Sequence, residues 1–363
     1  MTRKLRVGLG QFNELTDEKL AFIKQCGADD FLMNTPKLPG DKQWEYEDLL
    51  ALRRRADAAQ LRLMALENVP VSFYDKAMLG LPGRDEQIAH MQTTIRNMGR
   101  AGIPILGYHW MPNSVWRTPE MAVLRGGARG TRFNLAEHDP NQLTHGRIYT
   151  EDEMWANYEY YLARILPVAE ESNVQLALHP DDPPVPALGG IARIFRNFDG
   201  FKRAMDTFDS SYHGLDFCMG CWSEMGGMEN VIRAVRHFGA RDKIIYVHFT
   251  TSGHSRQFQR VLHQRRQRQP VRSGQDTARR GFYRFHDHRP RAPHGGRHRL
   301  GASRPRLRHR LYCCVDRGGG DAGVVRNAST QNTVSEEKRR GQSTLLALSM
   351  KTEAQDLLST GCV

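Results

Sequence analysis

The sequence predicts an α/β fold, a (β/α)8 TIM barrel that is incomplete because its last unit is missing. Seven short apolar, β-branched runs alternate with longer stretches of helical period, as is typical of parallel strands joined by crossover helices. This alternation stops after residue 249. A doubly wound open sheet is the competing fold, but no G-x-G-x-x-G or P-loop pattern follows the first strand-like run. The barrel is therefore favoured.

The elements follow from these runs in chain order. We expect strands at residues 6–10, 29–33, 62–66, 104–109, 174–179, 215–218 and 244–249, and helices at residues 17–26, 46–59, 85–101, 151–172, 201–207 and 228–238. Thr16 or Asp17 is a suitable N-cap for the first helix. The connection from residue 109 to residue 150 is rich in Gly, Pro and Arg, and loops of such length are often active-site lids.

The charge of the chain changes abruptly at Phe249. Up to Thr250 there are 29 Lys and Arg against 32 Asp and Glu, whereas residues 251–326 hold 19 Arg, seven His, four Asp and no Lys or Glu. Selection on a folded surface has no evident reason to remove every Lys and Glu and to keep Arg and His. Misframed translation of GC-rich DNA does produce this composition. We therefore predict a frameshift near Thr250, a disordered missense segment over residues 250–326, and an unrelated read-through tail over residues 327–363.

Composition excludes several classes of protein. The pI of about 9.6 would suggest a nucleic-acid partner, but the net positive charge lies entirely in the predicted missense segment, residues 250–326. An evolved Arg-rich binding arm on a degenerate barrel stays open as a minor alternative. No apolar run approaches the roughly 18 residues of a membrane span, and the N-terminus lacks a signal-peptide core. The six Cys are widely spread, which fits reduced thiols in a cytoplasm.

Metal-competent side chains stand at the ends of three successive strands. They are His179 in QLALHPDDPP, Cys218 in GLDFCMGCWSEMGG and His248 in KIIYVHF. Strand ends point into the active site of such a barrel, and two imidazoles with one thiolate suit manganese, iron(II) or zinc. Each residue alone could be an ordinary core or rim residue, so the prediction of a metal site depends on their joint occurrence.

Cys218 and Cys221 form a C-x-x-C pair, which could instead be redox-active or half of a zinc site. No second C-x-x-C occurs, and we expect no thioredoxin-like setting at a helix N-terminus with Pro between the cysteines. Asp181 and Asp182 follow His179 in a Pro-braced turn. They could orient a ligand imidazole, contact substrate hydroxyls or form a solvated acidic turn.

Further substrate-binding candidates lie near the third and fourth strands. His109, Trp110, Trp116 and Arg117 stand where the fourth strand meets the long loop, and such a cluster can wall a sugar-sized pocket, with Arg117 for a carboxylate. Ordinary loop packing is the alternative. Glu67 and Asn68 follow the third strand and are similarly placed polar candidates.

Taken together, the motifs ALHPDDPP, LGGIARI, GLDFCMGCWSEMGG and KIIYVHF, with GIPILGYHWMP and GGARGTRFN, closely resemble the mannonate dehydratase family over residues 1–249. The resemblance implies a barrel like that of xylose isomerase and removal of water from D-mannonate to give 2-dehydro-3-deoxy-D-gluconate. It further implies iron(II) or manganese(II) as cofactor and a place in hexuronate (glucuronate) catabolism. His179, Cys218 and His248 match the metal ligands of the family.

The same resemblance supports the frameshift. The family continues with N-E-G-N, T-D-H-V-P and R-A-Y-A-I-G-Y motifs, and none of them follows Phe249. Synonymous codons for residues 255–270 and 283–312, read one base later, permit passages that contain these motifs in order. The resemblance implies that a fourth ligand and the acid and base come from T-D-H and R-A-Y. Here those positions read as Arg289, Pro290, Arg291 and their neighbours, so the catalytic residues are unknown.

We therefore expect a mannonate dehydratase, a hydro-lyase, whose printed chain is poorly folded or inactive because a barrel without its last unit leaves two unpaired edges. Another metal-dependent sugar isomerase or epimerase of the same superfamily is the alternative, although it would need a second metal site of carboxylates. The expected partner is a small sugar acid, not nucleic acid or membrane, and homo-oligomeric assembly stays open.

Overall fold

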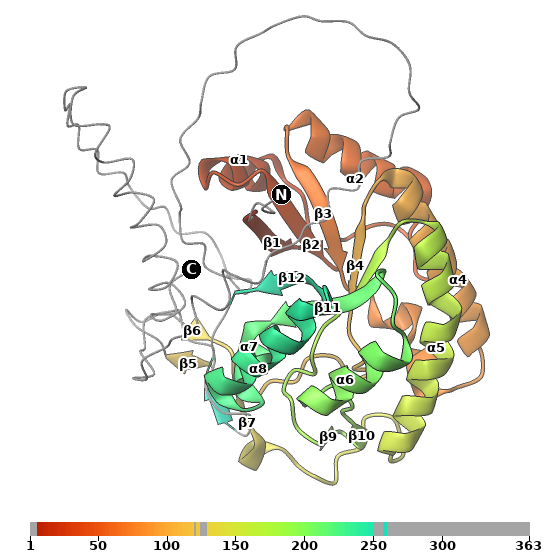
Figure 1. Ribbon diagram of the computed structural model, residues 1–363, viewed down its shortest axis with the longest axis vertical. Coiled ribbons are helices and arrows are strands. Elements are labelled where there is room, and N and C mark those ends of the chain that lie inside the picture. The colour runs from red at the N-terminus through yellow and green to blue at the C-terminus, as the bar shows by residue number, and fades with distance from the viewer. Residues whose placement is uncertain (1–5, 120, 124–128, 250–256, 260–363) are drawn as a thin grey trace, which may run out of the picture.

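The centre of the molecule is a seven-stranded parallel sheet. The computed structural model describes residues 6–119, 121–123, 129–249 and 257–259. The sheet strands follow chain order (Figure 1). They are β1 (Gly8–Phe12), β2 (Asp30–Asn34), β3 (Arg62–Glu67), β4 (Ile105–Tyr108), β8 (Gln175–Leu178), β11 (His213–Cys218) and β12 (Ile244–His248).

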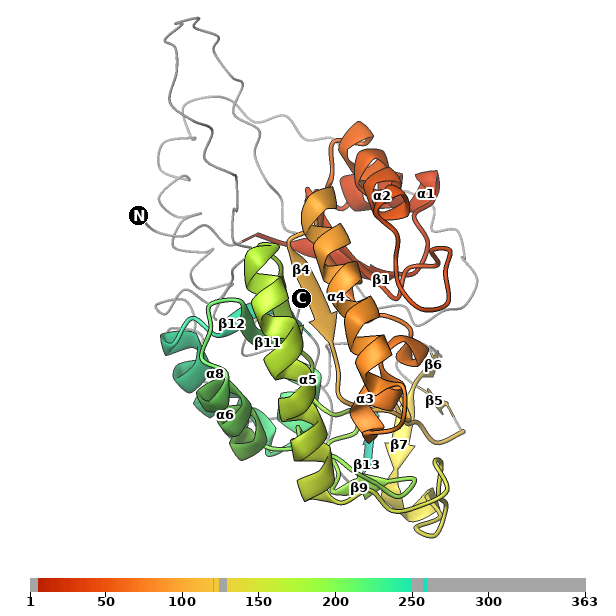
Figure 2. The same cartoon turned by 90° about the vertical axis from the view of Figure 1, so that its right-hand side faces the viewer.

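Helices connect successive strands and cover one face of this sheet (Figures 1 and 2). α4 and α5 lie side by side over the middle of the sheet in both views. The helices are α1 (Asp17–Gln25), α2 (Tyr46–Ala58), α3 (Asp75–Leu79), α4 (Arg84–Ala101), α5 (Glu151–Glu171), α6 (Phe198–Thr207), α7 (Met219–Glu224) and α8 (Gly227–Ala240). None of the helices in the described part of the chain is long and apolar enough to cross a membrane.

The sheet curls into a half-barrel. Three strands separate β3 from β12 in the sheet order, so a flat sheet would hold the two roughly 19 Å apart at about 4.8 Å per strand. Instead, Oε2 of Glu67 on β3 lies 2.9 Å from Nε2 of His248 on β12. The expected incomplete barrel of seven β/α units is confirmed, and the doubly wound alternative is excluded because the strand order never reverses.

The concave face of the sheet carries its own apolar cluster, Leu32, Ala65, Ile105, Ala177, Ile245 and Tyr246. Small residues face the large Tyr246 ring, which spans the interior from β12 to β4. A Cβ on Gly107 would stand 2.3 Å from the Tyr246 hydroxyl oxygen, so only glycine leaves room for the ring. This contact helps to fix how tightly the sheet curls.

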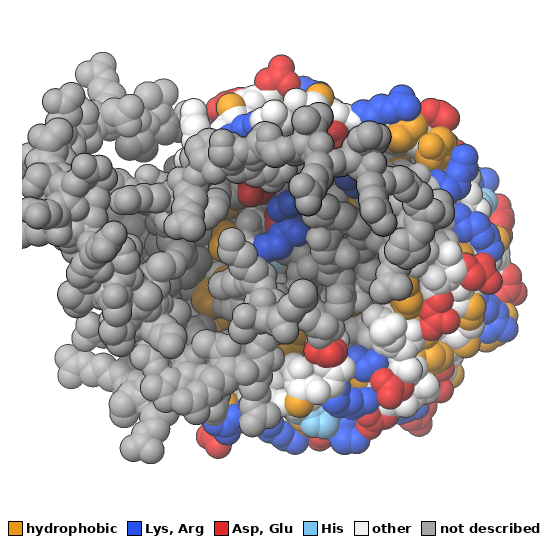
Figure 3. Space-filling view, turned by 45° about the horizontal axis from the view of Figure 1, so that its top comes forward, with side chains coloured by type: hydrophobic (Ala, Val, Ile, Leu, Met, Phe, Trp, Pro, Cys, Tyr) orange, Lys and Arg blue, Asp and Glu red, His pale blue; other side chains and the backbone are white. Residues whose placement is uncertain are grey.

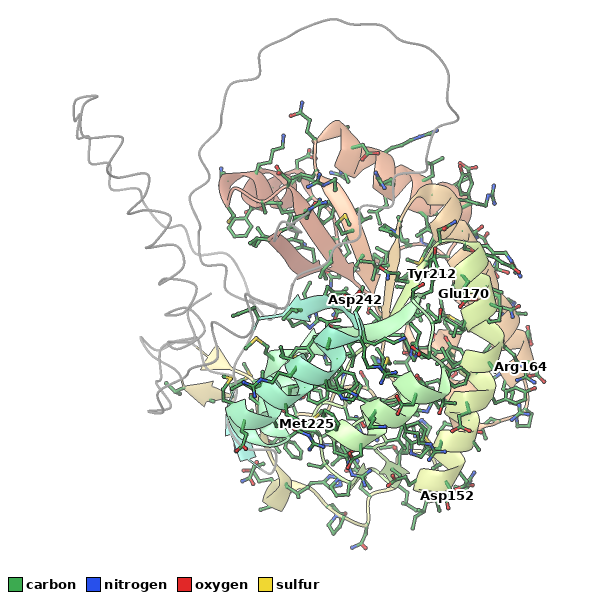
Figure 4. All side chains as sticks on the ribbon, viewed as in Figure 1. Asp152, Arg164, Glu170, Tyr212, Met225 and Asp242 are labelled. Carbon is green, nitrogen blue, oxygen red and sulfur yellow. The ribbon has the colours of Figure 1, made fainter. Side chains whose placement is uncertain are left out.

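The sequence of α5 explains where this helix begins and which of its faces is buried. Thr150 begins α5 with a capping box, in which its side chain accepts from the Glu153 amide and the Glu153 carboxylate accepts from the Thr150 amide. Buried residues then recur at helical spacing through α5, including Met154, Tyr158 and Leu162. Arg164 points away from the sheet on the outer surface, as Figure 4 shows. Acidic and basic side chains are interspersed over these outer helices (Figure 3).

The predicted elements are confirmed to within two residues at each end, apart from α6, which begins at Phe198, three residues before the expected start at residue 201. The short helices α3 and α7 were not predicted. The connection between residues 109 and 150 is not structureless, because it holds β5 (Ala122–Val123), β6 (Arg129–Gly130), β7 (Arg132–Asn134) and the 3-10 turn at Leu135–Glu137. Short pairings and turns of this kind have no periodic signal in sequence.

The predicted missense segment (250–326) and tail (327–363) lie outside the described residues, except for β13 (Gln257–Gln259), which pairs antiparallel with β7. The frameshift and these domain boundaries therefore stay predictions. A further hairpin within the described part joins β9 (Ala187–Leu188) to β10 (Ile191–Ala192), beyond the strand end that carries His179.

Candidate metal centre

Three metal-competent side chains meet at the carboxyl ends of neighbouring strands. His179 follows β8, Cys218 ends β11 and His248 ends β12. Cys218 and His248 are register partners on adjacent parallel strands. One donor atom from each of the three residues lies within 4.8 Å of the others. The structure thus brings together the ligand set that the strand ends predicted, at the edge of the barrel where such sites lie.

The donor set fits a borderline divalent ion such as manganese, iron(II) or zinc. Nδ1 of His179 lies 2.6 Å from the carbonyl oxygen of Pro180, to which it donates when it carries the proton. This hydrogen bond leaves Nε2 of His179 with its lone pair for a metal. Such outer contacts orient imidazole ligands in many metal sites.

The electrostatics of the cluster favour a thiolate beside protonated imidazoles. A hydrogen bond from the Cys221 thiol, with hydrogen bonds from both imidazoles, holds the pKa of Cys218 well below its usual value despite burial. Burial alone would lower the pKa of His179, but Asp216 and Cys218 outweigh it and raise that pKa to about 9. Burial is likewise outweighed at His248, whose pKa is raised by Asp216 and Glu67. A bound cation would replace these protons, because metal ligands must be deprotonated.

Glu67 lies against this centre instead of standing apart as a substrate contact alone. Its side chain is only 3% exposed, and its Oε2 lies 2.9 Å from Nε2 of His248. The side-chain amides of Gln11 and Asn34 donate to the same carboxylate at 3.2 and 3.4 Å. Glu67, Asp216 and His248 also have donor atoms within 4.8 Å of one another. Glu67 can therefore hold His248 or a cation next to it.

Asp216 is the site residue that sequence reasoning missed. Its Oδ1 lies 3.4 Å from Nδ1 of His248, and its Oδ2 accepts from the Tyr246 hydroxyl at 3.0 Å. Burial raises the pKa of Asp216 to about 7, although His248 acts in the opposite direction. A usable signal existed, because Asp216 precedes Cys218 by two residues and side chains of a strand alternate with period two.

Arg117 and Asp182, predicted separately, form a pair with each other. The two guanidinium nitrogens Nη1 and Nη2 donate to the two carboxylate oxygens at 2.6 Å each. The carboxylate expected for Arg117 is thus supplied by the chain itself. Asp182 also lies within 4.8 Å of donor atoms of Cys221 and Glu224, a third buried group with metal-ligand chemistry.

Asp181 and Trp110 make contacts within the fold. Asp181 accepts from the Phe195 amide at 2.7 Å and ties the loop after β8 in place. Trp110 is 1% exposed and donates from Nε1 to the Met154 carbonyl, so it packs in the core instead of lining a pocket. Its ring packs against Tyr158 and Tyr161 of α5. The sequence around Trp110 could not show this contact, because α5 lies about 45 residues further along the chain.

Trp116 and Asn68 also make contacts within the fold. The ring of Trp116 meets that of His138 edge-on at 5.2 Å between centroids. Asn68 adopts a left-handed backbone with φ of 60° directly after Glu67, and its Nδ2 lies 3.5 Å from Oδ1 of Asn34. Asn68 therefore shapes the turn that ends β3, and its Oδ1 is buried without a hydrogen-bond partner among the described residues. The substrate-binding roles of Trp116 and Asn68 stay predictions.

The C-x-x-C pair corrects one expectation. Cys218 is the N-cap of α7, so the pair does stand at a helix N-terminus. The sequence did not reveal this because α7 has only six residues. Both cysteines are free and buried. No second cysteine pair lies among the described residues, which speaks against a zinc site made of two such pairs. Cys218 lies close to His179 and His248, and this arrangement favours a metal centre over a redox-active pair.

Fold and site together define a class of protein, a (β/α) barrel with a group of His and Cys side chains that could hold a metal at the carboxyl edge of its strands. The family profile of D-mannonate dehydratase (UxuA) matches residues 10–149 and 141–270. The chain belongs to the mannonate dehydratase family.

Similar proteins agree with this family. The mannonate dehydratase of Streptococcus equi subsp. zooepidemicus is 30% identical over 236 residues, which are 58% of this chain and 64% of that protein. That of Thermotoga maritima is 30% identical over 243 residues, 58% of this chain and 66% of the relative. The crystal structure of mannonate dehydratase from Streptococcus suis serotype 2 superposes with a TM-score of 0.63 at 27% identity, covering 71% of this chain and 76% of that one. The chain thus spans just under two thirds of the length of these curated relatives.

Proposed function

We propose that this chain carries the site of a metal-dependent dehydratase that converts D-mannonate to 2-dehydro-3-deoxy-D-gluconate. The observation that carries the proposal is the meeting of His179, Cys218 and His248 at one edge of a half-barrel in a member of this family. The proposal includes iron(II) or manganese(II) as the metal, a role in hexuronate catabolism and a cytoplasmic location.

The reaction sets clear demands on the site. Dehydration of a 2,3-dihydroxy acid removes the weakly acidic proton at C2 and expels the hydroxyl at C3. A bound divalent metal would supply stabilisation of the negative charge that develops beside the carboxylate. A positioned base accepts the C2 proton, and an acid protonates the departing hydroxyl.

The geometry of the described residues supports the metal-binding part of this proposal. His179, Cys218 and His248 would hold the metal, and one carboxylate, Glu67 or Asp216, would orient His248 through the ring nitrogen that does not bind the metal. Four of these five side chains are buried and His248 is partly buried, and low solvent exposure strengthens the electrostatic contacts between them. The acid and base are not assigned, because the resemblance puts them in the T-D-H and R-A-Y motifs that the chain lacks after Phe249.

An activity assay tests the proposal on two proteins, the printed chain and a version whose reading frame is restored after Phe249. Each is loaded with manganese(II) or iron(II) and given D-mannonate or a set of aldoses. We expect metal-dependent formation of 2-dehydro-3-deoxy-D-gluconate by the restored protein and little or none by the printed chain. Conversion of aldoses instead of mannonate by the restored protein would support an isomerase or epimerase and contradict the proposal.

A further inference from the structure

His109 stands next to the metal centre on a neighbouring strand. Tyr108 and Leu178 are register partners on β4 and β8, and the amide of His179 donates to the Tyr108 carbonyl at 2.8 Å. His109 and His179 therefore leave adjacent strands at the same level. The Tyr74 hydroxyl donates to the backbone carbonyl of His109 at 2.9 Å and holds that strand end in place.

The hydrogen bonds of His109 select one tautomer. The amide of Met111 donates to Nδ1 of His109 at 3.2 Å, so Nδ1 is an acceptor. A neutral imidazole whose Nδ1 accepts carries its hydrogen on Nε2. Burial, then the charges of His179 and Arg193, lower the pKa of His109 to about 3, which keeps the ring neutral.

The Nε2–H of His109 is available to a ligand. Among the described residues, no side chain or backbone group forms a hydrogen bond with Nε2 of His109. Some polar atoms in the described part of the chain are fully enclosed and have no hydrogen-bond partner, and Nε2 of His109 is not among them. The nitrogen therefore keeps some accessible surface next to the strand end that carries His179, although the whole residue is only 5% exposed.

We propose that His109 donates its Nε2–H to an oxygen of the bound sugar acid, as a neutral hydrogen-bond donor beside the metal centre. The identity of this ligand rests on the proposed function. A fixed neutral N–H stabilises an oxygen that gains negative charge in the reaction and does not ionise in the process. His109 is then a substrate-contacting residue. The amide of Met111 selects its tautomer, because it donates to Nδ1 and leaves the hydrogen on Nε2.

The tautomer is tested by nitrogen NMR of the full chain labelled at histidine. Zinc serves as the loading metal because it is diamagnetic and suits the donor set. The signals of His109 are assigned as those missing from His109→Gln. We expect a protonated Nε2 and a bare Nδ1 from pH 5 to 8, with a change in the Nε2–H signal on addition of D-mannonate. A hydrogen on Nδ1, or signals that no sugar acid changes, would overturn the inference.

Matched variants test the contact by calorimetric titration of D-mannonate into the zinc-loaded chain. Glutamine places an amide nitrogen near the Nε2 position, whereas asparagine reaches only the Nδ1 position and phenylalanine offers no donor. We expect His109→Gln to bind within a few-fold of the parent, and His109→Asn and His109→Phe to bind roughly 10- to 100-fold more weakly. Equal affinity of His109→Phe and the parent would contradict the inference. Circular dichroism checks that each variant is folded.

The two proposals fail in different ways. If D-mannonate binds, changes the Nε2–H signal and yet is never dehydrated by the frame-restored, metal-loaded protein, the proposed function is wrong and the role of His109 stands. If mannonate is dehydrated and His109→Phe turns it over with unchanged kcat and KM, the proposed function stands and the role of His109 is wrong.

Discussion

The imidazole of His248 lies between two buried carboxylates, with Glu67 on its Nε2 side and Asp216 on its Nδ1 side. Carboxylates in this position fix the orientation of a ligand imidazole and raise its basicity. The hydroxyl of Tyr246 in turn donates to Asp216 at 3.0 Å. The candidate metal centre therefore includes buried carboxylates next to its proposed ligand His248.

Substitution Asp216→Asn tests this support. It keeps the size of the side chain but removes the charge that orients His248, so we expect the affinity for manganese(II) to fall roughly 10- to 100-fold. Tyr246→Phe is the matched control, because it removes one hydrogen bond and leaves the carboxylate, and its effect should be smaller. Metal titration followed by calorimetry gives both values. Unchanged affinity in Asp216→Asn would show that the carboxylate does not support the ligand.

A second residue controls stability at acidic pH. His213 is 1% exposed, and its Nε2 lies 3.1 Å from the Tyr108 hydroxyl and 3.2 Å from that of Tyr158. Burial lowers its pKa from 6.5 to about 4. The unfolded chain therefore binds the proton more readily, so stability is complete above about pH 6.5 and decreases as the pH falls toward 4.

We expect protonation of His213 to lower the free energy of unfolding by up to roughly 3 kcal/mol between pH 6.5 and pH 4. Urea unfolding at pH 7, 5.5 and 4.5 measures the effect. In His213→Gln, which cannot titrate but keeps an amide for hydrogen bonds, the decrease on acidification should be smaller by a similar amount. If parent and variant lose stability in parallel, His213 is not the group responsible.

Strand-end position was enough to predict that His179, Cys218 and His248 lie close together, because the topology of a barrel brings strand ends together. It could not separate Trp110, which is buried in the core, from residues that face the site. Nor did it find Asp216, because only the last residue of each strand was considered, although Asp216 shares a face of its strand with Cys218. Contacts across the curl, such as that between Glu67 and His248, have no local signal.

At the scale of elements, the contact of β12 with β4 shows how packing sets the curl. The Tyr246 ring occupies the space above Gly107, and a Cβ there would also come within 3.1 Å of the Glu67 side chain. Long elements such as α4, α5 and the sheet strands were predictable because their periodicity is sustained. The short helices α3 and α7 depend on tertiary contacts, so no local pattern announced them.

Gly107→Ala should therefore destabilise the fold by about 1–3 kcal/mol, the usual range for overpacking a core. Tyr246→Phe removes the oxygen that the new Cβ would meet, so the double variant should recover part of this loss relative to Tyr246→Phe alone. A double-mutant cycle by urea unfolding isolates the coupling. Additive effects of the two substitutions would contradict this account of the curl.

At the scale of the whole molecule, β1 and β12 are the two ends of the half-barrel sheet over the described residues. The family profile matches as far as residue 270, and the curated relatives extend beyond the part that aligns. The composition after Thr250, with 19 Arg and no Lys or Glu over residues 251–326, is the observation behind the predicted frameshift.

Resequencing the gene across the codons for Phe249 to Ser252 tests that prediction. We expect a one-base change to restore an open reading frame that encodes N-E-G-N, T-D-H-V-P and R-A-Y-A-I-G-Y in this order. A confirmed sequence in which no neighbouring frame encodes these motifs would show that the Arg-rich segment belongs to the protein.

The central claim is that Cys218, with His179 and His248, binds one divalent metal. Cobalt(II) tests it most directly, because cobalt bound to a thiolate gives an intense charge-transfer absorption in the near ultraviolet. We predict this band, at one cobalt per chain, in the parent and in Cys221→Ser, and its loss in Cys218→Ser. A band that persists in Cys218→Ser, or that disappears only in Cys221→Ser, would contradict the claim.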